Sequence, residues 1–228
     1  MKIPNYYLAR PAFTLDKTTR NACDALLAES LQRPGIDLTE HIPIPLWQFC
    51  CYLTDTHPVV LHGSKNASIS TFVPRRSFDR NPFGNRKAVF AASDGIWPMF
   101  FALVERERYQ LSLMNACFRV VKPSGQRSLP FYFFSITQAA LPHHPWSDGV
   151  IYLLPQMTFE QHPRQHANNG VTYEIMEWAS LQAVQPIAYL RVSPDDFPFL
   201  AQVRGHDEAV IQEQAKANPD GWPWADEP

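Results

Sequence analysis

Twenty-one prolines are scattered through this chain, against only nine glycines. Proline has no backbone N–H donor, so it interrupts helices and is excluded from the interior strands of sheets. The prolines are spread along the whole sequence and form no low-complexity tract that would indicate a linker. Their distribution therefore predicts many short strands and loops, with few long helices.

The length and the apolar content indicate a single domain with an ample core. The chain has 228 residues, of which 45% are hydrophobic. A chain of this size buries about 70% of the surface that its unfolded form exposes, so it needs neither disulfides nor a metal to fold. We expect one domain over 1–228, made of a helical N-terminal segment at 1–55, a core at 56–205, and a C-terminal helix and tail at 206–228.

Charge and cysteine usage limit the partners and the compartment. A formal net charge of -2 gives no broad electrostatic reason to expect nucleic acid, although a local basic patch is still possible. The cysteines follow no metal-ligand spacing, and two of them are adjacent, which is poor geometry for an ordinary disulfide. No apolar run reaches 18 residues, and no apolar segment follows the N-terminus. We therefore expect reduced thiols, a cytoplasmic location, and no membrane partner. The cysteines are Cys23, Cys50, Cys51 and Cys117.

Apolar periodicity predicts helices and strands in an unequal distribution. Helices are expected at 16–32 (with Asp16 as N-cap), 46–55, 94–108 (with Asp94 as cap) and 207–218. Apolar runs bounded by turn residues predict strands at 59–64, 87–94, 109–121, 129–136, 149–155, 172–180 and 186–192. The pattern indicates an α+β fold, with helices mainly in the N-terminal half and an antiparallel-rich sheet in the C-terminal half.

Three segments place polar or aromatic groups within strands that otherwise read as buried. The first is His62-Gly63-Ser64, the second is the run AVFAA around Phe90, and the third begins at Glu177. Burying an imidazole or a carboxylate costs free energy unless a partner or a ligand compensates. Each of the three segments is therefore a candidate for a functional role.

Their order and spacing resemble the three motif regions of ADP-ribosyltransferases of the His-Tyr-Glu type. In that family the first strand ends in His-Gly-Thr or His-Gly-Ser, and the second carries an aromatic residue and precedes a helix. The third begins with a glutamate and continues through a Val-x-Pro-like turn into another apolar strand. Here the corresponding runs are HGS, AVFAA and EWASLQAVQPIAYLRV, so the resemblance covers about 59–193. It implies an ADP-ribosyltransferase-like split antiparallel-rich sheet with N-terminal helices.

The resemblance also implies binding roles toward NAD. His62 would bond a hydroxyl of the adenosine ribose, and the backbone of Gly63 would hold the nicotinamide carboxamide, where a Cβ would block close approach. Ser64 would support that amide with its hydroxyl. Phe90 occupies the position of the family's tyrosine and would stack on the nicotinamide ring. Phe101, or its neighbour Phe100, would supply a second aromatic wall.

Glu177 is the expected catalytic residue. Cleavage of the nicotinamide–ribose bond generates an oxocarbenium-like cation, which a fixed carboxylate stabilises as the charge develops. Glu174 is a second carboxylate three residues earlier, and on one strand the two would face opposite sides. The context downstream favours Glu177. NAD is itself the activated donor, so no metal is expected.

Other readings of the same residues stay open. Phe90 keeps the stacking surface of a tyrosine but lacks its hydroxyl, which is compatible with a catalytically silent module that binds a nucleotide or a protein. His62 alone is equally compatible with a buried structural histidine, and Ser64 with a hydrolase serine. An RNA 2′-phosphotransferase-like member of the superfamily is less favoured because its arginine signature is not matched. The acceptor of a transfer reaction is not indicated by any residue.

Two clusters of basic residues invite separate hypotheses. An arginine-rich loop precedes the second motif, and it is either a solvated loop or a surface that steers a pyrophosphate or a nucleic-acid acceptor. Its residues are Arg75, Arg76, Arg80, Arg86 and Lys87. The pairs His143-His144 and His162/His166 have no accompanying zinc motif, and Pro163 disfavours a helix between His162 and His166, so no metal site is predicted.

Overall fold

The computed structural model describes residues 3–77, 79, 81–167, 170–219 and 221–224. The α-helices are α1 (Lys17–Gln32), α2 (Leu46–Thr56), α3 (Trp97–Leu103), α4 (Arg106–Tyr109) and α5 (Glu208–Ala217). The strands are β1 (Leu8–Ala9), β2 (Ile36–Asp37), β3 (Val59–Ser64), β4 (Arg75–Arg76), β5 (Lys87–Ala92), β6 (Leu113–Val121), β7 (Phe131–Thr137), β8 (Gly149–Pro155), β9 (Glu160–Gln161), β10 (Gln165–His166), β11 (Thr172–Ile175), β12 (Glu177–Ser180), β13 (Ala188–Val192) and β14 (Arg204–His206). Short 3-10 turns connect several of these elements.

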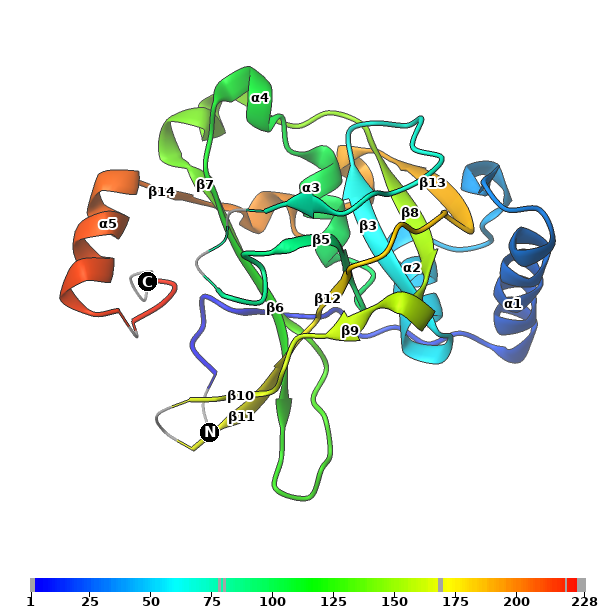
Figure 1. Cartoon of the computed structure of the whole chain (residues 1–228), viewed down its shortest axis with the longest axis horizontal. Helices are drawn as coiled ribbons and strands as arrows, with labels where there is room; N and C mark the ends of the chain where they lie inside the picture. Colours follow the sequence, from blue (N-terminus) through cyan, green and yellow to red (C-terminus); the bar gives the residue numbers. More distant parts are fainter. Residues whose placement is uncertain (1–2, 78, 80, 168–169, 220, 225–228) are drawn as a thin grey trace.

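The strands form two sheets. The β7 sheet has the order β1-β7-β6-β11-β10, with β14 also beside β7, and the β3 sheet has the order β2-β13-β8-β3-β5-β12-β9, with β4 beside β5. Only the pairs β2–β13 and β7–β14 are parallel among the described strands. The predicted α+β class with antiparallel-rich sheets is therefore confirmed. Figure 1 shows the sheets between α1 and α5, which lie at opposite ends of the long axis.

One large apolar cluster joins both sheets to α2 and α3. It contains Phe49 of α2, Met99 of α3, Tyr132 of β7 and Leu153 of β8, all at most 1% exposed. A second cluster covers the other face of the β3 sheet and contains residues such as Tyr152. The two faces of the β3 sheet are thus both covered, which explains why its strands read as nearly continuous apolar runs.

Local signals of the sequence position the helices that support the site. The Asp16 carboxylate accepts a hydrogen bond from the Thr19 N–H at 2.7 Å, which confirms the predicted cap of α1. The buried Asp94 carboxylate accepts from the N–H groups of Ile96 and Trp97, at 2.9 and 2.8 Å, and so fixes the turn that leads into α3, whose N-cap is Ile96. The proline at the start of α3 needs no N–H donor there.

The structure differs from the sequence-based boundaries in several places. The helix predicted over 94–108 ends at Leu103, because Val104 leaves helical geometry and forms a β-bridge with Trp146. The strand predicted over 172–180 is two strands, β11 and β12, which lie in different sheets. The N-terminal segment is helical as expected, but it also adds β1 to the β7 sheet and β2 to the β3 sheet.

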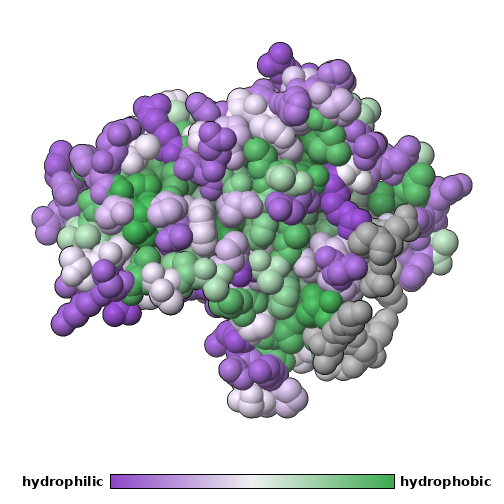
Figure 2. Space-filling model, turned by 180° about the vertical axis from the view of Figure 1, so that it is seen from behind, coloured by the Kyte–Doolittle hydropathy of each residue, from purple (hydrophilic) through white to green (hydrophobic). Residues whose placement is uncertain are grey.

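The surface is mixed in character. Seen from behind, apolar side chains lie in several areas among polar ones (Figure 2). The exposed large apolar side chains include Met157 at 91% and Leu181 at 64%. No helix in the described portion of the chain combines the length and the apolar character needed to span a membrane. The described cysteines are all free and buried.

Candidate functional site

The three strands that carry the motif residues are neighbours. In the β3 sheet the order β3-β5-β12 places the strand of His62 beside that of Phe90, and the strand of Phe90 beside that of Glu177. Glu177 pairs with Ala92 and Ala179 pairs with Phe90 in an antiparallel register. Segments separated by more than one hundred residues in the chain are therefore brought to one region of one sheet.

Strand register assigns Gly63, Phe90 and Glu177 to one face of the sheet. Ala92 lies opposite both Glu177 and Leu61, and directly opposed residues of antiparallel strands share a face. Residues two apart on a strand also share a face, so Phe90 lies on the same face as Ala92, and Gly63 on the same face as Leu61. This face carries α3, since Gly63 lies directly against the backbone of that helix.

Gly63 has a structural reason to be glycine. A Cβ at this position would lie 1.9 Å from the carbonyl oxygen of Pro98 and 3.0 Å from the backbone nitrogen of Ala102. Real Cβ atoms do not approach backbone atoms so closely. The glycine therefore allows α3 to lie directly on β3, and this packing explains the residue without reference to a ligand.

The His62 side chain lies on the opposite face of the β3 sheet from Gly63, and its ring also reaches between β3 and β5. The ring lies 4.8 Å from that of Phe72, in the second apolar cluster. Its Nδ1–H donates to the Phe90 carbonyl oxygen at 2.7 Å, because that oxygen can only accept. Leu61–Ala92 is the single described pair between β3 and β5, so the two strands diverge next to His62. The imidazole there forms a hydrogen bond with a β5 carbonyl that β3 leaves unpaired.

The hydrogen bond to Phe90 fixes the tautomer of His62. With the proton on Nδ1, the neutral ring presents Nε2 as an acceptor. Burial lowers the pKa of His62, and the nearby charge of Arg75 acts in the same direction, although the bond to the Phe90 carbonyl opposes them. The imidazole is therefore neutral near pH 7 and able to accept a hydrogen bond from a hydroxyl group.

The other predicted binding residues differ in accessibility. The Ser64 hydroxyl oxygen accepts from the Asn66 N–H at 3.0 Å, and strand alternation places Ser64 on the same face as His62 rather than that of Gly63. Phe100 is fully buried in the large cluster, whereas Phe101 is partly exposed at the edge of that cluster. Of the two aromatic residues considered on α3, Phe101 alone has surface for a ligand.

Glu177 is a partly buried carboxyl group with no ion pair among the described residues. Burial raises the pKa of Glu177 from 4.5 to about 7, and the negative charge of Asp79 adds to the rise. The positive charge of Arg86 opposes it. A carboxyl group whose pKa is shifted by desolvation, beside a basic residue, is typical of functional sites.

Asp79 and the segment at 81–86 lie close to Glu177, which the sequence did not predict. Asn81 donates from Nδ2 to His162 Nε2 at 2.7 Å, and the Phe83 ring lies 4.7 Å from that of His162. The His162 N–H in turn donates to the Glu177 backbone carbonyl at 2.9 Å. These contacts attach the arginine-rich segment to the start of β12, which the sequence pattern of scattered arginines does not reveal.

Arg86 is the member of the predicted arginine cluster that reaches the site. Its Nη1 forms an ion pair with Glu160, and its guanidinium lies 4.0 Å from the centre of the Phe83 ring. Its Nε and Nη2 atoms are buried and have no hydrogen-bond partner in the described portion of the chain. Arg75 and Arg76 are exposed on β4, and Arg80 falls outside the described residues.

Glu174 is held in a different environment. Its carboxylate is 4% exposed and accepts from Arg127 Nε at 2.7 Å and from Arg164 Nε at 2.8 Å. The hydrogen bonds and charges of these arginines, Arg127 first, hold the pKa of Glu174 below its usual range against the effect of burial. Glu174 therefore has a structural role, and Glu177 is the carboxylate available for chemistry.

The histidines considered as metal ligands do not converge. His162 donates from Nδ1 to the Pro163 carbonyl at 2.8 Å, so both of its ring nitrogens are engaged. His166 Nδ1 bonds the Thr172 hydroxyl at 3.0 Å. Within the described residues, no group of three or more His, Cys, Asp or Glu side chains is positioned to hold a metal ion.

Comparison with known proteins leaves the chain without an assigned relative. Models of known protein families, curated proteins and solved structures were each searched, and none matched. The function of the chain must therefore be inferred from its own residues.

Proposed function

We propose that this protein is an NAD-dependent ADP-ribosyltransferase, or an NAD-cleaving relative, with the split-sheet fold of that superfamily. The observation that supports this most is Glu177, a desolvated carboxyl group on β12 that shares a sheet face with Phe90 and lies two strands from His62. The three motif strands are neighbours in the order β3-β5-β12, but the His62 side chain lies on the opposite face of the sheet from Phe90 and Glu177, so the shared region of the sheet rather than a shared face supports the proposal.

The Glu177 carboxylate would stabilise the cation formed at the ribose. In the reaction the bond between ribose C1′ and the nicotinamide nitrogen breaks, and its electron pair leaves with the nicotinamide. The positive charge passes to the ribose as an oxocarbenium ion, and an acceptor nucleophile then bonds to C1′ and loses a proton. A preorganised charged group in a partly water-excluded site contributes about 3–4 kcal/mol to such a step.

His62 and Arg86 would bind the remainder of NAD. The lone pair on His62 Nε2 suits a ribose hydroxyl donor, because the Phe90 carbonyl already holds the proton on Nδ1. The Arg86 guanidinium, whose Nε and Nη2 atoms are buried, would contribute positive charge toward the phosphates of NAD. Phe90 and Phe101 offer aromatic surface on the side of α3.

A specific set of contacts favours a second candidate, a catalytically silent module that binds a nucleotide or a protein. The α3 backbone lies directly against Gly63, Phe72 covers the ring of His62, and the segment around Phe83 and Arg86 lies against the start of β12. These contacts leave a nucleotide less room than an open cleft would. Phe90, without a tyrosine hydroxyl, is compatible with this alternative.

Nicotinamide release distinguishes the two candidates. The purified chain is incubated with NAD, and free nicotinamide is measured for the native protein, for Glu177→Gln and for Glu107→Gln, an exposed glutamate on α4. The enzyme hypothesis requires release that is lost in Glu177→Gln and retained in Glu107→Gln. Absence of release in the native protein, together with no change in melting temperature on adding NAD, would favour the silent module.

A further inference from the structure

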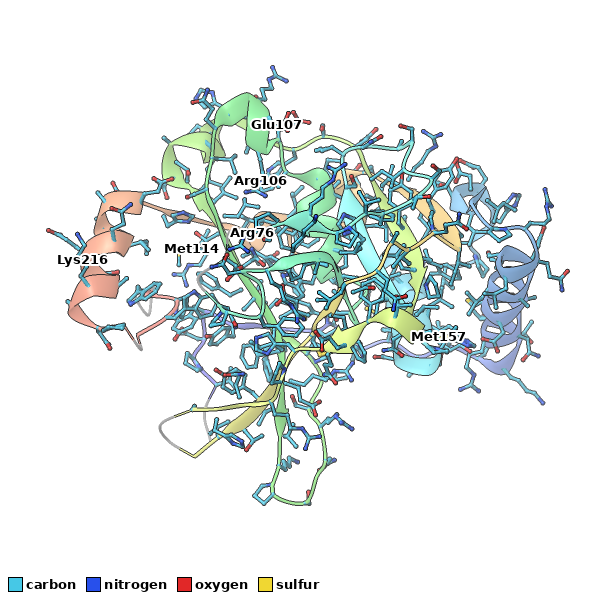
Figure 3. The ribbon with its side chains drawn as sticks, viewed as in Figure 1. Arg76, Arg106, Glu107, Met114, Met157 and Lys216 are labelled. Atoms are coloured by element: carbon cyan, nitrogen blue, oxygen red, sulfur yellow. The ribbon has the colours of Figure 1, made fainter. Side chains whose placement is uncertain are left out.

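The hairpin formed by β4 and β5 concentrates positive charge in a chain whose formal net charge is -2. Segment 75–87 carries five basic residues and one acidic residue. Arg75 pairs with Ala88 and Arg76 pairs with Lys87, so three of the four residues in this short ladder are cations. All three cations are exposed. Figure 3 labels Arg76 near the middle of the molecule, well away from α1.

Arg76 and Lys87 are like charges placed directly opposite each other. Opposed residues of an antiparallel pair have their Cβ atoms about 5 Å apart, and like charges in this relationship destabilise the pair. None of Arg75, Arg76 and Lys87 forms an ion pair among the described residues. Arg86, next to Lys87 in the chain, is paired with Glu160. An anionic partner would therefore relieve a repulsion that the described part of the chain does not neutralise.

The three cations lie on both faces of the hairpin. Successive residues of a strand point to opposite faces, so Arg75 shares one face with Ala88, while Arg76 and Lys87 share the other. Among the described strands β4 pairs only with β5, so its outer side is a free edge of the sheet. A flexible anionic chain can cross this edge and contact both faces, whereas a flat folded surface contacts only one.

The residue types favour phosphate groups as the anions. The planar guanidinium of arginine donates pairs of hydrogen bonds to phosphate oxygens. The same segment carries Phe83, a partly exposed aromatic ring whose centre lies 4.0 Å from the Arg86 guanidinium. Proteins that bind single-stranded nucleic acid combine basic side chains along the backbone with aromatic rings that stack on bases. An acidic peptide would use the charges of this hairpin but not the ring.

We propose that the β4–β5 hairpin binds single-stranded nucleic acid, with phosphates of one strand on Arg75, Arg76 and Lys87. The strand crosses the free edge of β4 and so reaches the cations on both faces. This binding requires neither NAD nor the Glu177 carboxylate. Failure of the proposed NAD reaction would therefore leave it intact, and its own failure would leave that reaction intact.

Fluorescence anisotropy of a labelled oligo(dT) strand of about 12 nucleotides tests the proposal on the full chain. We expect a dissociation constant of about 10–100 μM at physiological salt, within the range of sequence-independent binding. A DNA duplex of the same length should bind more weakly, because it is too stiff to follow the edge of β4. A polyglutamate peptide of equal charge should compete poorly. No binding at millimolar concentration, tighter binding of the duplex, or equal competition by polyglutamate would overturn the proposal.

Two matched double variants locate the binding. Arg76→Gln/Lys87→Gln should weaken oligo(dT) binding about tenfold or more at low salt. It should also reduce the slope of log K against log salt by about 1.4, because each phosphate contact with a single strand contributes about 0.7. Lys17→Gln/Arg20→Gln makes the same chemical changes at exposed positions of α1 and should alter neither quantity. Equal losses in the two double variants, or unchanged binding in the hairpin variant, would refute this site.

Discussion

The Glu174 and Glu177 carboxyl groups lie three residues apart in the chain but belong to two different sheets. Met176 joins the sheets, because its N–H donates to the Cys117 carbonyl of β6 at 3.0 Å and its carbonyl accepts from the Ser93 N–H at 2.9 Å. One carboxylate is consequently placed between two arginines, while the other is desolvated beside Arg86. The same short segment thus holds one structural and one candidate catalytic acid.

Replacing Glu177 by glutamine should stabilise the protein above neutral pH. The pKa of Glu177 is about 7 in the folded state and 4.5 as its ordinary value, so the folded state holds its proton more tightly. The native protein therefore loses stability as pH rises from about 4.5 to about 7. The full shift corresponds to about 3 kcal/mol, which solvent screening at this partly exposed group reduces to about 1–2 kcal/mol. Urea unfolding at pH 4 and pH 8 measures the difference.

In that experiment Glu177→Gln should exceed the native protein in stability at pH 8 and equal it near pH 4. Glu107→Gln, at an exposed position, serves as the control and should change little at either pH. A Glu177→Gln variant that is less stable than the native protein at pH 8 would mean that the carboxylate is paired or hydrated.

If the protein cleaves NAD through Glu177, the rate should depend on the same ionisation. The reaction requires the carboxylate, and the pKa of this group in the free protein is about 7. We expect kcat/KM for NAD to rise about tenfold per pH unit below 7 and to reach a plateau above it. Nicotinamide release measured between pH 5 and pH 9 tests this. A profile that is flat from pH 5 to pH 8 would show that the reaction does not require the ionised form of Glu177.

Glu174 should contribute to stability in the opposite pH range. Its arginine partners lower its pKa in the folded state, so the contribution is complete above the ordinary carboxyl pKa and is lost as the pH falls through the lowered value. Both arginines are about half exposed, which limits the cost of Glu174→Gln to about 1–3 kcal/mol at pH 7. Urea unfolding should show that this cost shrinks toward pH 3, and a cost independent of pH would contradict the ion-pair account.

Gly63→Ala should destabilise the protein through packing against α3. The added Cβ would meet the Pro98 carbonyl oxygen at 1.9 Å, and overpacking of this kind costs about 3 kcal/mol. Gly125→Ala is the comparison, because its Cβ would meet no atom within 4 Å and only its φ of +84° is unfavourable, at about 1–2 kcal/mol. Thermal unfolding of both variants measures the difference. Equal losses would show that α3 can move away from β3.

Local patterns were sufficient for most of the elements. Asp16 identifies the start of α1, since an N-cap carboxylate bonds an N–H group two or three residues later wherever that helix lies. Asp94 marks the turn before α3, because its carboxylate bonds the N–H groups of Ile96 and Trp97. The apolar runs at 59–64 and 87–92 identify β3 and β5, because strands covered on both faces require apolar residues throughout. The candidate site residues His62, Phe90 and Glu177 were also identified from the sequence.

The partners of those residues were decided only by tertiary structure. The sequence predicted a continuous strand at 172–180, yet the chain changes sheets at Met176, whose N–H bonds the Cys117 carbonyl of β6 and whose carbonyl accepts from the Ser93 N–H, next to β5. Similarly, the run of arginines does not distinguish Arg86, which reaches Glu177, from Arg75 and Arg76, which remain exposed. The sequence by itself determined which groups the chain carries and where its strands and helices occur. Desolvation and charge at each group depend on long-range contacts. The tertiary structure alone therefore decided that Glu174 is an ionised carboxylate paired with two arginines, and that burial raises the pKa of Glu177.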